Sequence, residues 1–422
     1  MTTTTSSSDL HTHARGLGAE REAEIVAARA DRHRSARLRP AYGFDDVAIV
    51  PGTEAIHPDD VNTTFQLGEH RFAIPFIASA MDGVVDVPFA IKIGQMGGLG
   101  VLNLDGLQTR YEDPSQPLAD IAAAEPGQVT ALMQKLYQAP VREDLVGRRI
   151  AEIKRAGVKA AVSCTPTTAG RFGPLADAAG VDLFVVQATV STRRFRSSRI
   201  AEGGSGYSGT GGHTALDFEQ FCRAMRAPVV VGNCVTYEAA LELMDAGIAG
   251  LLVGVGPGAA CTSREVLGIG VPQVTATLDC SAARDAHYAR SGRYVPIITD
   301  GGMKTGGDVC KAFASGADAV MIGSPFAQAE EAPGRGHHWG MATPHAGLPR
   351  GTRIKVGVNG SLQTILFGPT SKSDGTQNFV GALRTCMGTV GAGTIRDMHE
   401  VEMVIAPAMK TEGKSWQLSG AF

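Results

Sequence analysis

The feature that most constrains the fold of this chain is a series of eight short apolar segments, spread over 422 residues. Their apolar residues run continuously instead of alternating with polar ones, which is typical of strands covered on both faces. Several are followed by helical patterning, such as Tyr237–Ala246 and Gly307–Ser315. Strands that alternate with helices predict an α/β fold, here a (β/α)8 TIM barrel, with a doubly wound sheet as the alternative that strand count does not exclude. The eight predicted strands are Ile74–Ala80, Gly98–Asn103, Lys159–Cys164, Asp182–Ala188, Pro228–Cys234, Gly250–Val255, Val295–Gly301 and Ala319–Ser324.

Composition indicates a globular protein of the cytoplasm. Hydrophobic residues make up 43% of the chain and the formal net charge is −3, so nothing indicates binding to nucleic acid or to an acidic membrane surface. No run of about 18 apolar residues is present, and the N-terminus lacks the apolar core of a secretory signal. Seven cysteines without a C-x-x-C pair argue against a disulfide framework or a zinc site.

Three segments bear on domain organisation. Residues 1–37 carry few large apolar side chains and are expected to form a disordered tail, which leaves 38–422 as one domain. An extra helix is predicted over Gln128–Ala139, between the second and third strands. The arginine- and glycine-rich segment Arg193–Thr214 is expected to be an irregular surface loop.

A glycine-rich segment after the sixth predicted strand carries the best candidate for a nucleophile. It reads Gly254-Val-Gly-Pro-Gly-Ala-Ala-Cys-Thr-Ser-Arg264, and glycines let the backbone approach a ligand closely because no Cβ intervenes. Thr262 or Ser263 is expected to cap a helix that begins near Glu265. Cys261 would then lie where a helix N-terminus favours the thiolate, the nucleophilic form of cysteine. The alternative is a buried cysteine in a tight turn.

Other short motifs fall at the carboxyl ends of predicted strands, where barrel enzymes carry their chemistry. Asp300-Gly-Gly302 ends the seventh strand and Gly323-Ser324 the eighth, and the loops after these two strands frequently bind phosphate through backbone N–H groups. An aspartate at the edge of that site is placed to accept hydrogen bonds from a ribose diol. Ser79-Ala-Met-Asp82 ends the first strand, and Asn233 lies in the fifth. These motifs predict a phosphorylated, ribose-bearing ligand with an electrophilic atom near Cys261.

With these motifs the chain resembles the IMP dehydrogenase and GMP reductase family, most closely its IMP dehydrogenase-related branch. The matches run in family order over nearly the whole domain, and the Gly-Pro-Gly-x-x-Cys-Thr loop is the specific one. The resemblance implies a TIM barrel that acts at C2 of a purine nucleotide monophosphate, GMP or IMP, with NADPH or NAD as cofactor. The matching motifs are Phe44-Asp-Asp-Val47, Ser79-Ala-Met-Asp82, Gly97-Gly-Leu-Gly100, Gly232-Asn233, Gly254 to Arg264, Asp300-Gly-Gly302, Met321-Ile-Gly-Ser324, Gly340-Met341, Gly381-Ala-Leu-Arg384 and Gly391-Ala392.

The resemblance also implies roles for individual residues. Cys261 would attack purine C2, and Ser263 would take the place of the family's catalytic threonine. The family often holds a monovalent cation, K⁺, through carbonyls around the cysteine loop, here those of Gly256, Gly258 and Cys261. A homotetramer or octamer is expected. The implied substrate-binding positions are Ser79, Met81, Asn233, Asp300, Gly302, Gly323, Ser324, Gly340 and Met341, and the implied cofactor-binding positions are Gln187, Gly254 and Gly256.

Departures from the family pattern favour the reductase direction. Dehydrogenases usually carry a regulatory insertion of two CBS modules after the second strand, and the stretch from Asp105 to Ala156 is too short for it. They also activate water with an Arg-Tyr pair after the Gly-Met motif. No such pair occurs between Met341 and Ile354, where Arg350 or Arg353 would have to substitute. The reductase has its own gap, since Gly357-Val-Asn359 replaces its proton-relaying glutamate.

Other departures concern cofactor and phosphate. Gln187 stands where the family often has a cofactor-binding aspartate, and the loss of that carboxylate would ease binding of the extra phosphate of NADP; Ala259 replaces a serine that commonly touches phosphate. GMP reductase is the leading interpretation. IMP dehydrogenase, a purine-nucleotide-binding regulatory protein without turnover, and a flavin-dependent barrel enzyme are the alternatives. His337-His338-Trp339 is interpreted as a hinge and not as a metal site.

Overall fold

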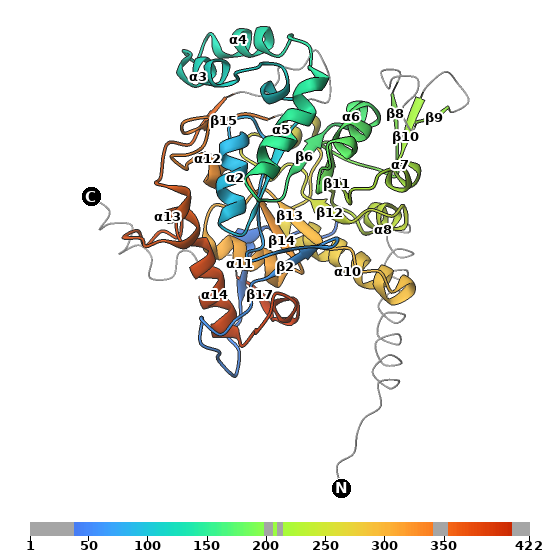
Figure 1. Ribbon diagram of the computed structural model, residues 1–422. Coiled ribbons are helices and arrows are strands. Elements are labelled where there is room, and N and C mark those ends of the chain that lie inside the picture. Colours follow the sequence, from blue (N-terminus) through green and yellow to red (C-terminus); the bar gives the residue numbers. More distant parts are fainter. Residues whose placement is uncertain (1–37, 198–205, 209–213, 341–352, 407–422) are drawn as a thin grey trace.

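A closed barrel of eight parallel strands forms the centre of the protein (Figure 1). The computed structural model describes residues 38–197, 206–208, 214–340 and 353–406. Pairing of β7 with β11 and of β14 with β4 completes the ring, so the TIM barrel is confirmed and the open, doubly wound sheet is excluded. In ring order the strands are β4 (Phe76–Ala78), β5 (Leu99–Asn103), β6 (Ala161–Cys164), β7 (Leu183–Gln187), β11 (Val229–Cys234), β12 (Gly250–Val253), β13 (Ile297–Asp300) and β14 (Ala319–Ile322).

Each predicted apolar segment contains one of these barrel strands, and burial on both faces is the reason. One face of the strands packs in the barrel interior with residues such as Leu99, Leu252 and Ile298. The other face packs against the surrounding helices in a larger apolar cluster. Because neither face meets water, no polar residue is required at alternate positions.

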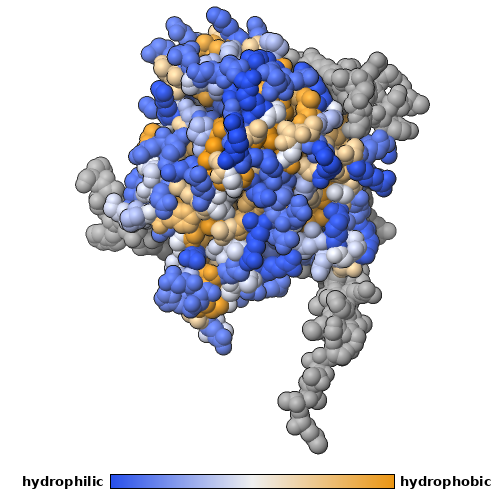
Figure 2. Space-filling model, in the orientation of Figure 1, coloured by the Kyte–Doolittle hydropathy of each residue, from blue (hydrophilic) through white to orange (hydrophobic). Residues whose placement is uncertain are grey.

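Helices cover the outside of the barrel. The predicted helices are confirmed as α8 (Tyr237–Asp245) and α11 (Gly306–Ala314). The sequence starts α11 with a capping box, in which Thr305 Oγ1 accepts from the Asp308 N–H and the Asp308 carboxylate accepts from the Thr305 N–H. The other helices of the covering layer are α2 (Val87–Gln95), α5 (Glu143–Arg155), α6 (Pro166–Ala178), α7 (Phe218–Ala224), α10 (Gln273–Ser291), α12 (Ser324–Ala327), α13 (Leu362–Phe367) and α14 (Phe379–Val390). On the face drawn in Figure 2, apolar residues are scattered among polar ones.

A hairpin closes the amino-terminal end of the barrel and leaves the carboxyl end open. It consists of β2 (Phe65–Leu67) and β3 (His70–Phe72), which pair antiparallel. Phe65, Leu67 and Phe72 pack in the same apolar cluster as the barrel interior. The open end is therefore the one where barrel enzymes place their chemistry.

Some elements were not predicted. The extra helix is confirmed as α4 (Val129–Leu136), but α3 (Ser115–Ala123) precedes it. The prediction of an irregular loop over Arg193–Thr214 is wrong in part. It contains β8 (Arg194–Ser197) and β9 (Gly206–Ser208), which both pair antiparallel with β10 (Thr214–Asp217). Backbone pairing with β10 stabilises these strands where local composition does not indicate them.

Two more short sheets complete the fold. β1 (Val47–Ile49) pairs with β17 (Met403–Ile405), and β15 (His337–His338) pairs with β16 (Ile354–Lys355). Single 3₁₀ turns lie at Phe44–Asp46, Leu107–Thr109 and Asp397–Glu400. Among the helices of the described residues, none is long and apolar enough to cross a membrane. The predicted tail, residues 1–37, lies outside the described part of the chain.

Candidate active site

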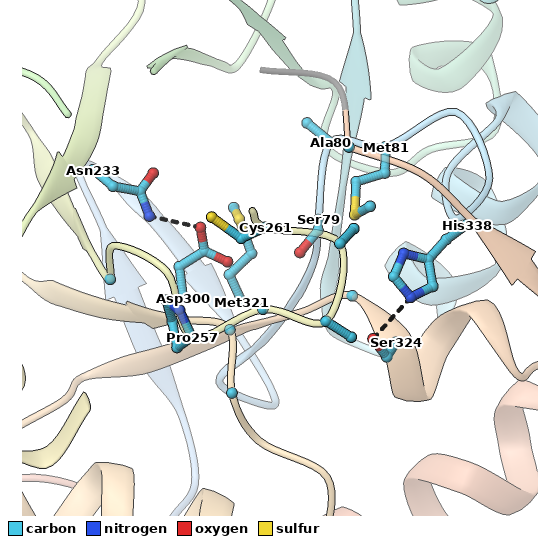
Figure 3. Close-up of a pocket in the computed structure, with 18 of the residues that line it drawn as sticks. Ser79, Ala80, Met81, Asn233, Pro257, Cys261, Asp300, Met321, Ser324 and His338 are labelled. Carbon is cyan, nitrogen blue, oxygen red and sulfur yellow. Dashed lines mark hydrogen bonds between the residues drawn. The ribbon is translucent and has the colours of Figure 1, made fainter. Parts of the chain in front are cut away.

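The carboxyl ends of the barrel strands surround a cavity of about 850 Å³. Sites for small molecules and cofactors typically measure about 300–1,000 Å³, so there is room for a large ligand or for two. Figure 3 shows Asn233 and Asp300 on one side of Cys261, and Ser79, Ser324 and His338 on the other. Met341 lies outside the described residues. Every other predicted site residue lines the cavity: Ser79, Met81, Gln187, Asn233, Gly254, Gly256, Gly258, Cys261, Ser263, Asp300, Gly302, Gly323, Ser324 and Gly340.

Three polar side chains from the ends of β7, β11 and β13 meet at Asp300. Gln187 Nε2 and Asn233 Nδ2 donate hydrogen bonds of 2.9 and 2.8 Å to the same carboxylate oxygen, Oδ2 of Asp300. Gln187 Nε2 also lies 3.0 Å from Asn233 Oδ1. These bonds hold the Asp300 carboxylate in one orientation at the cavity wall (Figure 3).

The environment of Asp300 sets its ionisation. Burial raises the pKa of Asp300 to about 6, because a charged carboxylate is disfavoured away from water. The hydrogen bonds from Asn233 and Gln187 act in the opposite direction, because they stabilise the charged form. At neutral pH Asp300 is therefore ionised and acts as a hydrogen-bond acceptor, which is what binding a pair of hydroxyl groups requires.

Cys261 is half-buried in the loop between β12 and α9 (Ser263–Leu267). Its Sγ lies 3.3 Å from Ser263 Oγ, and its N–H donates to the Gly258 carbonyl at 2.9 Å. The predicted helix is confirmed as α9, which begins at Ser263, two residues before the predicted start near Glu265, with Thr262 at the N-cap position. The Thr262 hydroxyl makes no cap bond, because Thr262 has φ −104° and ψ 8° where a side-chain cap needs extended backbone. What the site offers is a thiol beside a hydroxyl at the cavity wall.

Close backbone packing explains two of the glycines. Gly254 has φ +151°, and a Cβ built there would lie 2.2 Å from the Asp300 carbonyl oxygen. Gly302 has φ +82°, and a Cβ there would lie 3.0 Å from Pro257 Cβ. Glycine tolerates both the conformation and the approach. The cysteine loop and the turn after β13 therefore pack directly against each other, which brings Cys261 and Asp300 into one cavity.

The opposite wall contains a residue that sequence reasoning missed. His338 Nε2 lies 2.9 Å from Ser324 Oγ, and His338 is buried and lines the cavity (Figure 3). Burial lowers the pKa of His338 to about 4, so its ring is neutral at pH 7. His337 and His338 form β15 and Trp339 is buried, and the interpretation of these three residues as a hinge stays a prediction. The one sequence signal that could have indicated His338 as a site residue is its position two residues before Gly340-Met341.

A third wall extends from β5 to β7 and is lined by small polar side chains. Asp105, Ser163, Thr165 and Thr189 belong to it. Asp105 Oδ2 accepts hydrogen bonds from the Thr165 N–H at 2.8 Å and from Thr168 Oγ1 at 3.0 Å. The middle strand of this wall, β6, lies across the barrel from β13, and Cys261 lines the same cavity. Within the described residues, no three His, Cys, Asp or Glu side chains are grouped to hold a metal ion.

Comparisons with known proteins agree with this geometry. The family model for the IMP dehydrogenase / GMP reductase domain matches residues 41–415. An uncharacterized oxidoreductase of Mycobacterium leprae is 39% identical over 377 residues, which cover 87% of this chain and 97% of that protein. An inosine-5′-monophosphate dehydrogenase of Borreliella burgdorferi is 30% identical over 406 residues, covering 85% of this chain and 92% of the enzyme.

A solved structure gives the same result. The crystal structure of an IMP dehydrogenase/GMP reductase-like protein from Corynebacterium glutamicum superposes with a TM-score of 0.79 at 32% identity, covering 88% of this chain and 96% of that one. The family model, these relatives and the closed barrel with its cysteine loop lead to one conclusion. This chain is an oxidoreductase that belongs to the IMP dehydrogenase/GMP reductase family.

Proposed function

We propose that this protein reduces GMP to IMP, with NADPH as the hydride donor and ammonia as the second product. The observation that carries the chemistry is the Cys261 thiol, which lies 3.3 Å from the Ser263 hydroxyl in the same cavity as Asp300. A nucleophile and an acceptor for a ribose diol in one cavity fit a nucleotide whose base is attacked. Covalent catalysis of this kind divides one difficult substitution into two easier steps.

In this proposal, different walls of the cavity bind the substrate and the cofactor. Backbone N–H groups of Gly302, Gly323 and Ser324 would hold the 5′-phosphate, with Ser79 beside them, and Asp300 would accept hydrogen bonds from both ribose hydroxyls. The purine then lies over Cys261. The polar wall from β5 to β7 and the Gln187 side would hold the nicotinamide cofactor, and the cavity volume of about 850 Å³ fits both molecules.

In the proposed reaction Cys261 acts as nucleophile and then as leaving group. Its sulfur forms a bond to purine C2, the amino group leaves as ammonia after gaining a proton, and Ser263 Oγ is the nearest hydroxyl to exchange that proton. A bound nicotinamide cofactor supplies a hydride. Once C2 carries that hydride, the C–S bond breaks and the electron pair returns to sulfur. GMP, NADPH and two protons thus balance IMP, NADP⁺ and ammonium.

The reductive direction is supported by the position of Arg353. Its Nη1 donates to the carbonyls of Ile121 and Ala122 in α3, at 2.6 and 2.8 Å, and Arg353 is not among the described residues that line the cavity. The arginine that was a candidate to activate water is thus engaged elsewhere. Arg350, the other candidate, lies outside the described residues. Because Arg353 is engaged away from the cavity, the described residues offer no arginine in the place of the family's Arg-Tyr pair, which disfavours hydrolysis of the covalent adduct and favours reduction.

IMP dehydrogenase is the second candidate, because the relative from Borreliella burgdorferi carries that name. In this direction IMP loses hydride to NAD⁺ and water cleaves the adduct to give XMP. The cysteine, the ribose acceptor and the phosphate loops would serve both directions equally. Gly357-Val-Asn359, which stands in place of the glutamate of the reductase, carries no carboxyl group to act as an acid, and the Asn359 amide donates to Thr376.

Further parts of the proposal rest on the family resemblance. K⁺ would be held by carbonyls of Gly256, Gly258 and Cys261; the Gly258 carbonyl already accepts one hydrogen bond and keeps a second lone pair for a cation. The enzyme is proposed to act in the cytoplasm as a homotetramer or octamer.

Mixing the protein with GMP and NADPH, and separately with IMP and NAD⁺, tests the direction by nicotinamide absorbance. We expect oxidation of NADPH with GMP only. The rate should be higher with NADPH than with NADH, because Gln187 stands where a carboxylate would repel the extra phosphate of NADPH. The rate should also be lower when K⁺ is replaced by Na⁺. Reduction of NAD⁺ with IMP would overturn the direction. No change of nicotinamide absorbance in either assay, with GMP binding intact, would indicate a regulatory nucleotide-binding protein.

The pKa of Asp300 gives a second test of the proposed ribose contact. Affinity for guanosine is expected to fall about tenfold between pH 7 and pH 5, because a proton competes with the ribose hydroxyls for a carboxylate whose pKa is about 6. Guanosine is preferred to GMP since a phosphate monoester also titrates near pH 6. Calorimetric titrations across this range measure the effect, and 2′-deoxyguanosine, which lacks one hydroxyl, should show less dependence. Equal profiles for the two nucleosides would contradict the contact.

A further inference from the structure

A pair of helices stands beside the open end of the barrel, and no part of the proposed chemistry uses it. We call residues 115–137, which contain α3 and α4 and end at Tyr137, the helical insert. It lies beyond α5 at the edge of the molecule, with β15 next to it (Figure 1). Its buried apolar side chains form a cluster to which Trp339 comes from a distant part of the chain, and Met81 packs against this cluster.

One phenol connects this insert to two cavity-lining segments. The Tyr137 hydroxyl donates to Asp82 Oδ2 at 2.6 Å and accepts a hydrogen bond from Trp339 Nε1 at 2.8 Å. Asp82 and Trp339 are both fully buried, so these bonds are shielded from water. Asp82 Oδ2 also accepts from the Leu107 N–H at 2.7 Å, which fixes the carboxylate from a second direction. We call this chain of bonds the Trp339–Tyr137–Asp82 relay.

Both outer members of the relay are covalently next to residues of the cavity wall. Asp82 follows Met81 in the chain, and Trp339 lies between His338 and Gly340. Met81, His338 and Gly340 line the cavity. The two segments also pack closely, since a Cβ built on Gly83 would lie 2.8 Å from the His337 carbonyl oxygen. A shift of the relay therefore moves Met81 or His338, and with His338 the Ser324 hydroxyl to which it is hydrogen-bonded.

We propose that Tyr137 is a positioning residue, through which the helical insert holds the cavity wall at Met81 and His338 in the geometry that binds the nucleotide. It touches no substrate itself and acts through the two buried partners. The assignment of a nucleotide as ligand rests on the proposed function. The Tyr137 hydroxyl serves a buried carboxyl group and a buried indole N–H at once. Either of these groups left without its partner in the interior would lower stability.

Tyr137→Phe tests the proposal, with Tyr111→Phe as matched control. Both variants remove a phenolic hydroxyl at the helical insert; that of Tyr111 donates to the Leu136 carbonyl at 3.0 Å and is not part of the relay. In Tyr137→Phe, hydrogen exchange at the amides of 79–84 and 334–340 should rise and GMP affinity should fall on the order of tenfold. In Tyr111→Phe both should stay at the wild-type level, although thermal stability falls in each variant. Trp339→Phe should reproduce the effects of Tyr137→Phe, and the double variant should add little because both act on one chain of bonds.

The readouts separate this proposal from the proposed function. If exchange rises at those amides while the wild-type protein binds neither GMP nor IMP, the relay is supported and the assignment of the nucleotide fails. If the two tyrosine variants lose stability alike, with exchange and affinity at the wild-type level, Tyr137 is merely structural and the proposal is wrong. A loss of GMP affinity equal in both variants would overturn it as well.

Discussion

Cys261→Ala is expected to abolish turnover, with a loss of about 10⁴-fold or more, and to leave the affinity for GMP nearly unchanged. Cys164 also lines the cavity, but it is buried and burial raises the pKa of its thiol well above the usual value, which leaves Cys261 as the proposed nucleophile. Removal of a nucleophile costs catalysis on this scale. The proposed binding contacts at Asp300 and the phosphate loops do not depend on the sulfur. Steady-state rates and calorimetric titration of the same preparation measure the two effects.

Cys222→Ala serves as control for this prediction. Cys222 is a half-buried free thiol away from the cavity, and burial raises its pKa to about 12, so it stays protonated at neutral pH. Its replacement should leave turnover unchanged. Mass spectrometry of the wild-type protein quenched during turnover should detect a purine adduct on Cys261. Retention of more than a few per cent of activity by Cys261→Ala would show that the reaction is not covalent.

Asp300→Ala is expected to weaken GMP binding by about 100-fold and to lower turnover further. Two hydrogen bonds from the ribose to a charged acceptor are lost, each worth roughly 1.5–3 kcal/mol, and part of this is offset by water entering the space. The change also leaves Gln187 Nε2 and Asn233 Nδ2 without the carboxylate that they share. Calorimetric titration with GMP and with 2′-deoxy-GMP measures the contribution of the diol, which should be lost in the variant.

Asp86→Ala is the matched control for Asp300→Ala. Burial raises the pKa of Asp86 to about 6 as well, and its carboxylate accepts from the Phe89 N–H at the start of α2, outside the cavity. Loss of this cap should lower thermal stability and leave GMP affinity unchanged. If Asp300→Ala also loses only stability, and still distinguishes GMP from its 2′-deoxy form, the assignment of the ribose contact is wrong.

Much of the fold could be predicted because the signal is local. A barrel strand is buried on both faces, so its sequence is a continuous apolar run. The chain contains eight such runs, one for each barrel strand. α3 was missed because its buried side chains, such as Leu118 and Ile121, pack only in the small cluster with Trp339, far along the chain. The strands at Arg194–Ser197 and Gly206–Ser208 were missed for a similar reason, since antiparallel pairing with β10 stabilises them.

The candidate site, like the fold, has residues that the sequence predicted and residues that it did not. Cys261, Asp300 and the glycine turns were found because each is a short motif at the end of a predicted strand, and parallel strands in a barrel bring all their carboxyl ends to one side. His338 and Tyr137 have no such motif. Tyr137 is 55 positions from Asp82 and 202 from Trp339, and a single tyrosine or tryptophan in a sequence does not indicate which distant group it bonds.

What the sequence by itself determined is the alternation of eight buried strands with helices, the place of Cys261 after the sixth strand and the resemblance to the family, since these depend on burial patterns and on motifs of a few adjacent residues. Closure of the sheet into a barrel was decided by the pairing of β7 with β11 and of β14 with β4. Only the tertiary structure decided which side chains share hydrogen bonds: Gln187 and Asn233 with Asp300, His338 with Ser324, and Tyr137 with Asp82 and Trp339. The physical reason is that a hydrogen bond forms between atoms within about 3.5 Å, and that proximity is set by the packing of whole elements and not by neighbouring residues in the chain.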